Sequence, residues 1–134
     1  MTLQEREARA CAIIDSMAEE LRDVSLYLHD NPELGLNEHK AVKVINQFLE
    51  NHNFTSQVGL TDLPELQTAL RGDYNGTAQH KIAFLGEYDA LPELGHGCGH
   101  NLIAMMSLGA AIAFSQSAPE TWGTTFFGCP ADET

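Results

Sequence analysis

The feature that most constrains the fold of this chain is the run IAFL at residues 82–85, which is apolar at every position. A strand without a polar face is typical of a sheet that is covered on both faces. The stretch GEYDALP, residues 86–92, follows at once and favours a turn. We therefore expect a strand buried on both faces, within an α/β domain.

Helices are predicted on either side of this strand along the chain. Apolar residues three and four positions apart mark two amphipathic helices before it, which Pro32 and Gly35 separate. Residues 102–114 are apolar nearly all round and predict a buried helix with Asn101 as its N-cap. The apolar residues expected to be buried are Ile13, Met17, Leu21, Val24 and Leu28 in the first helix and Ala41, Val44, Ile45, Phe48 and Leu49 in the second.

Two further strands are predicted, at residues 66–72 and 122–127. Strands that alternate with helices indicate a layered α/β domain with a mainly parallel sheet, and 134 residues suit one domain. Ligands of such sheets bind beyond the carboxyl ends of the strands. Two polar clusters, GEYDALP and GCPADE, each follow a predicted strand, and GHGCGH comes shortly after the first. These clusters predict one site.

Composition excludes some classes of partner. The chain has 7 Lys and Arg against 19 Asp and Glu, so its formal net charge of -12 argues against binding to nucleic acid or to an anionic membrane. The opening residues, MTLQEREARA, do not resemble a secretory signal, and the longest apolar run is too short to span a bilayer. The 3 cysteines have no regular spacing, which argues against a disulfide framework and predicts the cytoplasm.

The stretch GHGCGH brings a thiol and an imidazole close together. Cys98 and His100 are two residues apart, so in an extended segment their side chains leave the same side of the backbone. Both are good ligands for zinc, cobalt, manganese or iron, and Gly97 and Gly99 would leave room for an ion and permit unusual dihedral angles. The alternative is a glycine loop around a buried cysteine. A cysteine nucleophile with His100 as its base ranks lower, and so does His96 as a ligand.

Carboxylates supply the other candidates. Asp132 and Glu133 are adjacent after the last predicted strand, so one can bind an ion while the other takes a proton from an activated water. Asp89 can orient a ligating imidazole through its second nitrogen. The alternatives are a solvated acidic turn for the pair and capping or turn formation for Asp89. Glu87 is expected to be exposed or to support a ligand.

Three stretches of this chain resemble motifs of the M20 metallopeptidases. They are LHDNPELGLNE, GEYDALPELGHGCGHN and GCPADE, in the family's order and at similar spacing. The most similar branch is the amidohydrolase-like one, which includes aminoacylase-type and aminobenzoyl-glutamate hydrolases. The resemblance covers nearly the whole chain. It implies a three-layer α/β/α zinc-peptidase-like catalytic domain with a divalent metal centre (Zn, Mn or Co), often binuclear.

The family motifs imply a role for each candidate residue. Cys98, His100 and Glu133 match metal ligands. Asp132 falls where the family has its general base, and Asp89 matches a supporting catalytic aspartate. The implied reaction is hydrolysis of an amide bond in a dipeptide or an N-acyl amino acid. The metal lowers the pKa of water to about 7 and polarises the carbonyl group, and the base moves the proton to the leaving nitrogen.

The chain also departs from the family pattern. Asp132 replaces a glutamate, and a base that is misplaced by about 1 Å costs about a hundredfold in rate. Cys129 replaces a threonine. Family members are much longer, so residues 1–134 are expected to be the N-terminal part of a catalytic domain, without its C-terminal part and a lid or dimerisation domain. We expect little activity from this part alone, and homo-oligomers only of a full-length form. The alternative is a non-catalytic remnant that binds metal weakly or associates with a partner through an exposed sheet edge.

Overall fold

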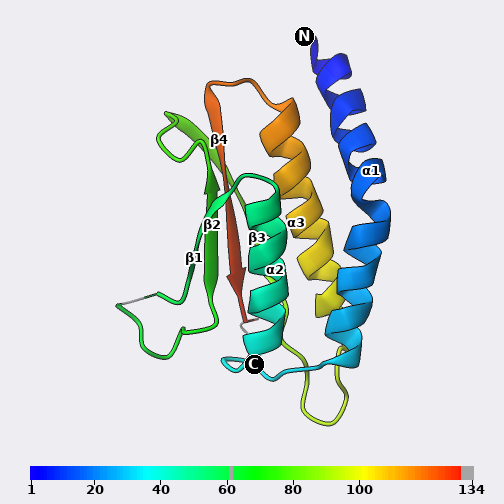
Figure 1. The fold of residues 1–134 in the computed structure, drawn as a ribbon, viewed down its shortest axis with the longest axis vertical. Helices are drawn as coiled ribbons and strands as arrows, with labels where there is room; N and C mark the ends of the chain where they lie inside the picture. Colours follow the sequence, from blue (N-terminus) through cyan, green and yellow to red (C-terminus); the bar gives the residue numbers. More distant parts are fainter. Residues whose placement is uncertain (61, 131–134) are drawn as a thin grey trace.

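Strands and helices alternate along the chain, which confirms the predicted α/β class. Figure 1 shows the computed structural model, which describes residues 1–60 and 62–130. No helix within these ranges is both long and apolar enough to cross a membrane. In chain order the elements are α1 (Leu3–Asp30), α2 (His39–Asn51), β1 (Thr55–Val58), β2 (Leu70–Tyr74), β3 (His80–Glu87), α3 (His100–Ser117) and β4 (Trp122–Cys129).

The strands form one mixed sheet in the order β1-β2-β4-β3. β3 and β4 are parallel, whereas β1 is antiparallel to β2 and β2 is antiparallel to β4. The prediction of a mainly parallel sheet is therefore wrong for these strands. A parallel pair needs a long crossover, usually a helix, and among the described connections between strands only that from β3 to β4 contains one, α3.

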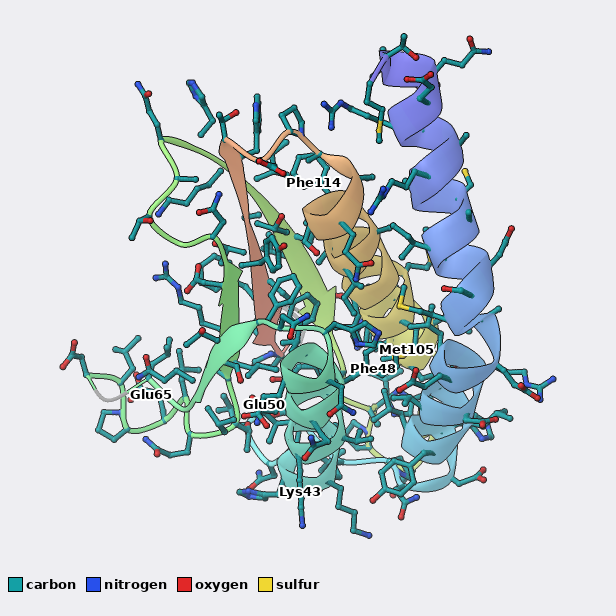
Figure 2. All side chains as sticks on the ribbon, turned by 45° about the horizontal axis from the view of Figure 1, so that its top comes forward. Lys43, Phe48, Glu50, Glu65, Met105 and Phe114 are labelled. Atoms are coloured by element: carbon teal, nitrogen blue, oxygen red, sulfur yellow. The ribbon has the colours of Figure 1, made fainter. Side chains whose placement is uncertain are left out.

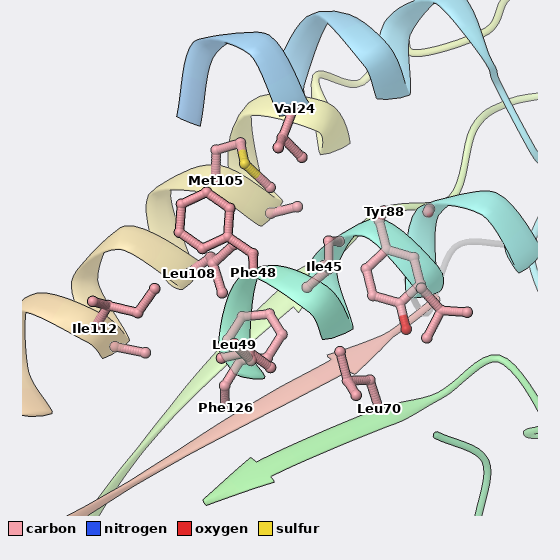
Figure 3. Close-up of a cluster of buried hydrophobic side chains, with 14 of the residues drawn as sticks. Val24, Ile45, Phe48, Leu49, Leu70, Tyr88, Met105, Leu108, Ile112 and Phe126 are labelled. Carbon is pink, nitrogen blue, oxygen red and sulfur yellow. The ribbon is translucent and has the colours of Figure 1, made fainter. Parts of the chain in front are cut away.

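The helices all lie on one face of the sheet (Figure 1). α2 and α3 pack on the strands, and α1 packs mainly on α3. The apolar faces predicted for the first two helices are confirmed, because most of their members belong to the core and the rest pack against it. Figure 3 shows side chains from α2, α3 and the sheet meeting in this core, among them Ile45, Leu49, Leu70, Leu108, Ile112 and Phe126.

The other face of the sheet is less covered. Leu85 of β3 is 61% exposed and Ile82 is 36% exposed, so the expectation of burial on both faces is wrong within the part of the chain that the structure describes. The reason is that β3 is the last strand of the sheet and the described helices cover one face only. The second helical layer of a three-layer arrangement is not among residues 1–60 and 62–130.

α3 differs from its prediction at two points. Leu102 and Met106 are 59% and 71% exposed, so the helix is not buried all round. Its N-cap is Gly99, in the left-handed conformation with φ 81°, rather than Asn101. The side-chain amide of Asn101 is buried and donates to the carbonyl oxygen and the hydroxyl of Ser25 on α1. The helix thus begins at His100 and carries this imidazole in its first turn.

Candidate metal centre

The polar clusters that follow β3 and β4 begin at the same end of the sheet. The two strands are parallel, and their last residues, Glu87 and Cys129, are partners in the register. The carboxyl ends therefore meet as the sequence predicts, and GEYDALP leaves the sheet beside the end of β4. The candidate residues Asp132 and Glu133 lie outside the described residues.

His100 is the most closely held side chain at this end of the sheet. It is 3% exposed, and its Nδ1 lies 2.8 Å from the carbonyl oxygen of Asp89 and 3.2 Å from Oδ1 of the same residue. A carbonyl oxygen only accepts hydrogen bonds, so this contact assigns the proton to Nδ1. In the neutral ring the lone pair is then on Nε2, which is the state of a histidine oriented for metal binding.

Glu87 lies on the other side of the same ring. Its Oε2 is 3.4 Å from Nε2 of His100, and its side chain is 35% exposed. The imidazole therefore stands between two carboxylates, those of Glu87 and Asp89. The sequence analysis expected Glu87 to be exposed or to support a ligand, and its contact with His100 agrees with the second of these roles. The available signal was the spacing, because residues two apart at the end of a strand point to the same side.

Cys98 lies in a turn rather than in the extended segment that the sequence suggested. The backbone N–H of Gly99 donates to the carbonyl oxygen of His96 at 3.1 Å, and α3 begins one residue later. The thiol of Cys98 is exposed, so the alternative of a buried cysteine in a glycine loop is wrong. Gly99 is needed for its positive φ and not to avoid crowding, since a Cβ there would meet nothing within 4 Å.

His96, the weaker ligand candidate, is half-buried beside these residues. Burial lowers its pKa, and the nearby His100 lowers it further. Both causes favour the neutral imidazole, which is the form that binds a metal. Its role as a ligand stays a prediction.

A second polar cluster at this end was missed by sequence reasoning. Tyr88 is buried, and its hydroxyl donates to the carbonyl oxygen of Thr68 at 2.5 Å. The hydroxyl of Thr68 in turn donates to Glu38, which is 0% exposed. Burial raises the pKa of Tyr88, and the charge of Glu38 raises it further. An acidic residue at the start of a helix normally faces water, so the sequence contained no signal for this cluster.

Cys129 is half-buried at the end of β4. Burial raises the pKa of its thiol, and the carboxylates of Glu87, Asp89 and Glu38 raise it further. The thiol is therefore held in its protonated form, which is a poor nucleophile and a poor ligand. Cys129 is therefore a weaker candidate for a metal ligand than the exposed Cys98.

The donor chemistry of the described residues fits a divalent ion only in part. His100 offers an oriented imidazole nitrogen and Glu87 a carboxylate, which suit zinc, manganese or cobalt. Within residues 1–60 and 62–130, no three His, Cys, Asp or Glu side chains form a group that could hold an ion. The arrangement thus has the orienting contacts of a metal centre and an incomplete ligand set.

Comparison with known proteins gives relatives along nearly the whole chain. The Xaa-Arg dipeptidase of Mus musculus is 36% identical over an alignment of 136 positions, which covers 93% of this chain and 32% of the relative. A p-aminobenzoyl-glutamate hydrolase of Escherichia coli is 30% identical, over 90% of this chain and 28% of the relative. The chain thus spans about a third of the length of these curated relatives. No family model matches it.

Solved structures show the same fold. A dinuclear metal-binding peptidase of the M20 family from Bacillus subtilis superposes with a TM-score of 0.73 and 26% sequence identity, over 89% of this chain and 37% of that one. A leucine aminopeptidase precursor from Bacteroides thetaiotaomicron has a TM-score of 0.58 at 19% identity, a likeness of fold alone. The described sheet and helices therefore match part of a metallopeptidase catalytic domain.

Proposed function

Because the chain belongs to the M20 family of metallopeptidases, we propose that it contributes the first part of a metal-dependent amidohydrolase or dipeptidase. Its relatives include an Xaa-Arg dipeptidase, an aminobenzoyl-glutamate hydrolase and an N-acetylcysteine deacetylase. Each of these names implies cleavage of an amide bond next to an amino acid. The proposed substrates are therefore small dipeptides or N-acyl amino acids.

The observation that supports this proposal most directly is the position of His100. Its Nδ1 is held by Asp89, so that Nε2 of the neutral ring presents its lone pair at the carboxyl end of β3. We propose that Nε2 binds the ion and that Asp89 orients the ring.

The remaining roles are proposed from the family motifs. Cys98 and Glu133 would bind the ion with His100, and zinc, manganese or cobalt would suit this set. Such an ion, one or two per site, supplies a water of lowered pKa and polarises the substrate carbonyl group. Asp132 would take the proton of this water and give it to the leaving nitrogen. Chains with three free thiols belong in a reducing compartment, and we propose the cytoplasm.

We also propose that this chain is the N-terminal part of the catalytic domain. The relatives are about three times as long as the segment that they share with it. Other ligands, substrate contacts and any oligomer interface would then come from the remainder of such a protein. Residues 1–134 alone are expected to show little or no turnover.

Metal content and a chimaera test this function. The purified chain, incubated with Zn²⁺, Mn²⁺ or Co²⁺ and desalted, should retain metal, and His100→Ala should lose it. The matched control is His39→Ala, because His39 is exposed at the start of α2. A chimaera that joins this chain to the remainder of the mouse relative should hydrolyse dipeptides. If the unaltered chain retains no metal and the chimaera is folded but inactive, the proposal is wrong.

A second candidate function is association without catalysis. Leu85 is 61% exposed on the edge strand β3, so a partner that pairs with this edge and packs on the open face of the sheet would cover it. The proposed occupant is the remaining part of an M20 catalytic domain, since the chain spans about a third of its relatives. The separately produced remainder of the mouse relative should then elute with this chain on size exclusion. Leu85→Asp should abolish this, whereas Val58→Asp on the opposite edge strand, β1, should not.

A further inference from the structure

Glu87 is not among the ligands that the M20 motifs assign in this sequence, yet it lies against one of them. Its carboxylate oxygen Oε2 is 3.4 Å from Nε2 of His100, the nitrogen that carries the lone pair in the neutral ring. We propose that Glu87 is itself a ligand of the metal ion, an inference that rests on the metal centre proposed above.

The separation of the two atoms is the first argument. Ligands that are each about 2.1 Å from a tetrahedral ion lie about 3.4 Å apart. The oxygen of Glu87 and the nitrogen of His100 are separated by 3.4 Å. The separation of the two atoms is therefore that of two ligands of one tetrahedral ion.

The contrast between Glu87 and Asp89 is the second argument. The side chain of Asp89 is 0% exposed and lies at Nδ1, where it can orient the ring but cannot reach an ion on Nε2. The side chain of Glu87 is 35% exposed and lies at Nε2. An ion between Glu87 and His100 would be accessible from solvent, as an exchangeable metal must be. The two carboxylates thus divide the tasks of binding and orientation.

The chemistry of the donor set is the third argument. An imidazole nitrogen and a carboxylate oxygen are both ligands that zinc binds in proteins, and Glu87 and His100 supply one of each. A carboxylate on a flexible side chain adds negative charge beside a neutral imidazole and strengthens the attraction for a divalent cation. The alternative role for Glu87 is that of a counter-ion to a protonated His100, which would involve no metal.

Zinc and cobalt binding by the whole chain separate these two roles. Zn²⁺ affinity is measured by calorimetry, and the visible absorption spectrum of bound Co²⁺ reports on the ligand set. Glu87→Gln should weaken Zn²⁺ binding by about a hundredfold, the upper end of what loss of an outer partner costs, and should alter the Co²⁺ spectrum. The matched control is Glu93→Gln, an exposed carboxylate in the following loop, which should change affinity by less than about twofold.

A conservative variant distinguishes a metal-ligand role of Glu87 from a counter-ion role. Glu87→Asp keeps the charge but withdraws the oxygen by about 1.5 Å, the length of one carbon–carbon bond. A ligand role predicts that affinity falls and the Co²⁺ spectrum changes, whereas a counter-ion role predicts that both stay as in the unaltered chain. Urea unfolding of each variant verifies that it is folded.

The outcomes separate this inference from the proposed function. If His100→Ala loses the metal while Glu87→Gln and Glu87→Asp bind Zn²⁺ like the unaltered chain, Glu87 is not a ligand and the metal centre stands. If the unaltered chain takes up neither Zn²⁺ nor Co²⁺, the inference about Glu87 is overturned, and the activity of the chimaera then decides the proposed function.

Discussion

Glu38 and Asp89 are both buried carboxylates at the same end of the sheet, but their surroundings differ. Glu38 accepts hydrogen bonds from the backbone N–H of Leu36 and from the hydroxyl of Thr68. Thr68 is joined to Tyr88, whose ring lies in the core (Figure 3), so this cluster points inward. Asp89 is buried as well, but His100 links it to Glu87, whose side chain is 35% exposed, so this second cluster reaches the surface.

This difference shows that burial alone does not separate structural from functional carboxylates. The contacts of Glu38 join the loop before α2 to the loop before β2, which holds neighbouring segments together. The contacts of Asp89 fix one ring whose second nitrogen reaches a carboxylate accessible to solvent. The charged side chains of Lys43, Glu50 and Glu65, which Figure 2 labels, are exposed instead. Each variant below tests this division.

The largest effect is expected from Glu38→Ala. The substitution leaves the N–H of Leu36 and the hydroxyl of Thr68 without their buried acceptor, which should lower the free energy of unfolding by about 3 kcal/mol. Urea denaturation measures this, with Glu50→Ala on the exposed side of α2 as the control, expected within about 0.5 kcal/mol. A loss below about 1 kcal/mol would show that the cluster of Glu38 does not hold the fold.

The next largest effect is expected from Gly128→Ala, which tests the packing of the same cluster. A Cβ on Gly128 would lie 2.5 Å from Cε1 of Tyr88, so the ring would have to move away from Thr68. Overpacking of this kind costs about 2 kcal/mol. Gly97→Ala is the matched control, because a Cβ there meets its neighbours at 3.7 Å or more. Equal stability of the two variants would mean that Tyr88 moves without cost.

The smallest of the three effects is expected from Asp89→Asn, which tests the cluster of Asp89, His100 and Glu87 through its Zn²⁺ affinity. The amide cannot supply the charge that holds Nδ1–H of His100, so Zn²⁺ affinity should fall by about tenfold. Calorimetry measures this. The control is Asp73→Asn on β2, since Asp73 pairs with Thr125 of β4, four residues before the end of that strand. Unchanged Zn²⁺ binding by a folded Asp89→Asn variant would show that Asp89 is as structural as Glu38.

Local patterns predicted the described elements of this fold except β1 (Thr55–Val58), for which no strand was expected. Apolar spacing identified α1 and α2 together with their buried faces, and Pro32 marked the end of the first helix, since α1 ends at Asp30. These are short-range features, because each helix buries the stripe that its own sequence defines. The predicted strands at residues 66–72 and 122–127 overlap β2 and β4, because they too were predicted from short-range sequence patterns.

The site was predicted only in outline. Chain order placed both polar clusters beyond the ends of strands, and the parallel pairing of β3 with β4 brings those ends together. The contact between Glu87 and His100 joins residues from β3 and α3, and the spacing of Glu87 and Asp89 indicated only that their side chains leave the same side of the chain. Gly99, in the left-handed conformation, is the N-cap of α3. The helix therefore begins at His100, and Cys98 lies in the turn before it rather than in an extended segment.

By itself the sequence determined which segments form helices and strands, which helix stripes are buried and which polar residues belong to the end of the sheet. These properties depend on neighbours along the chain. Only the tertiary structure decided the order of the strands, which face of the sheet the helices cover, and which carboxylate meets which donor. Those properties depend on contacts between segments that are apart in the sequence. Thr68 contacts Glu38 and His100 contacts Glu87 only in the folded chain, and the residues next to each of them in the sequence do not predict its partner.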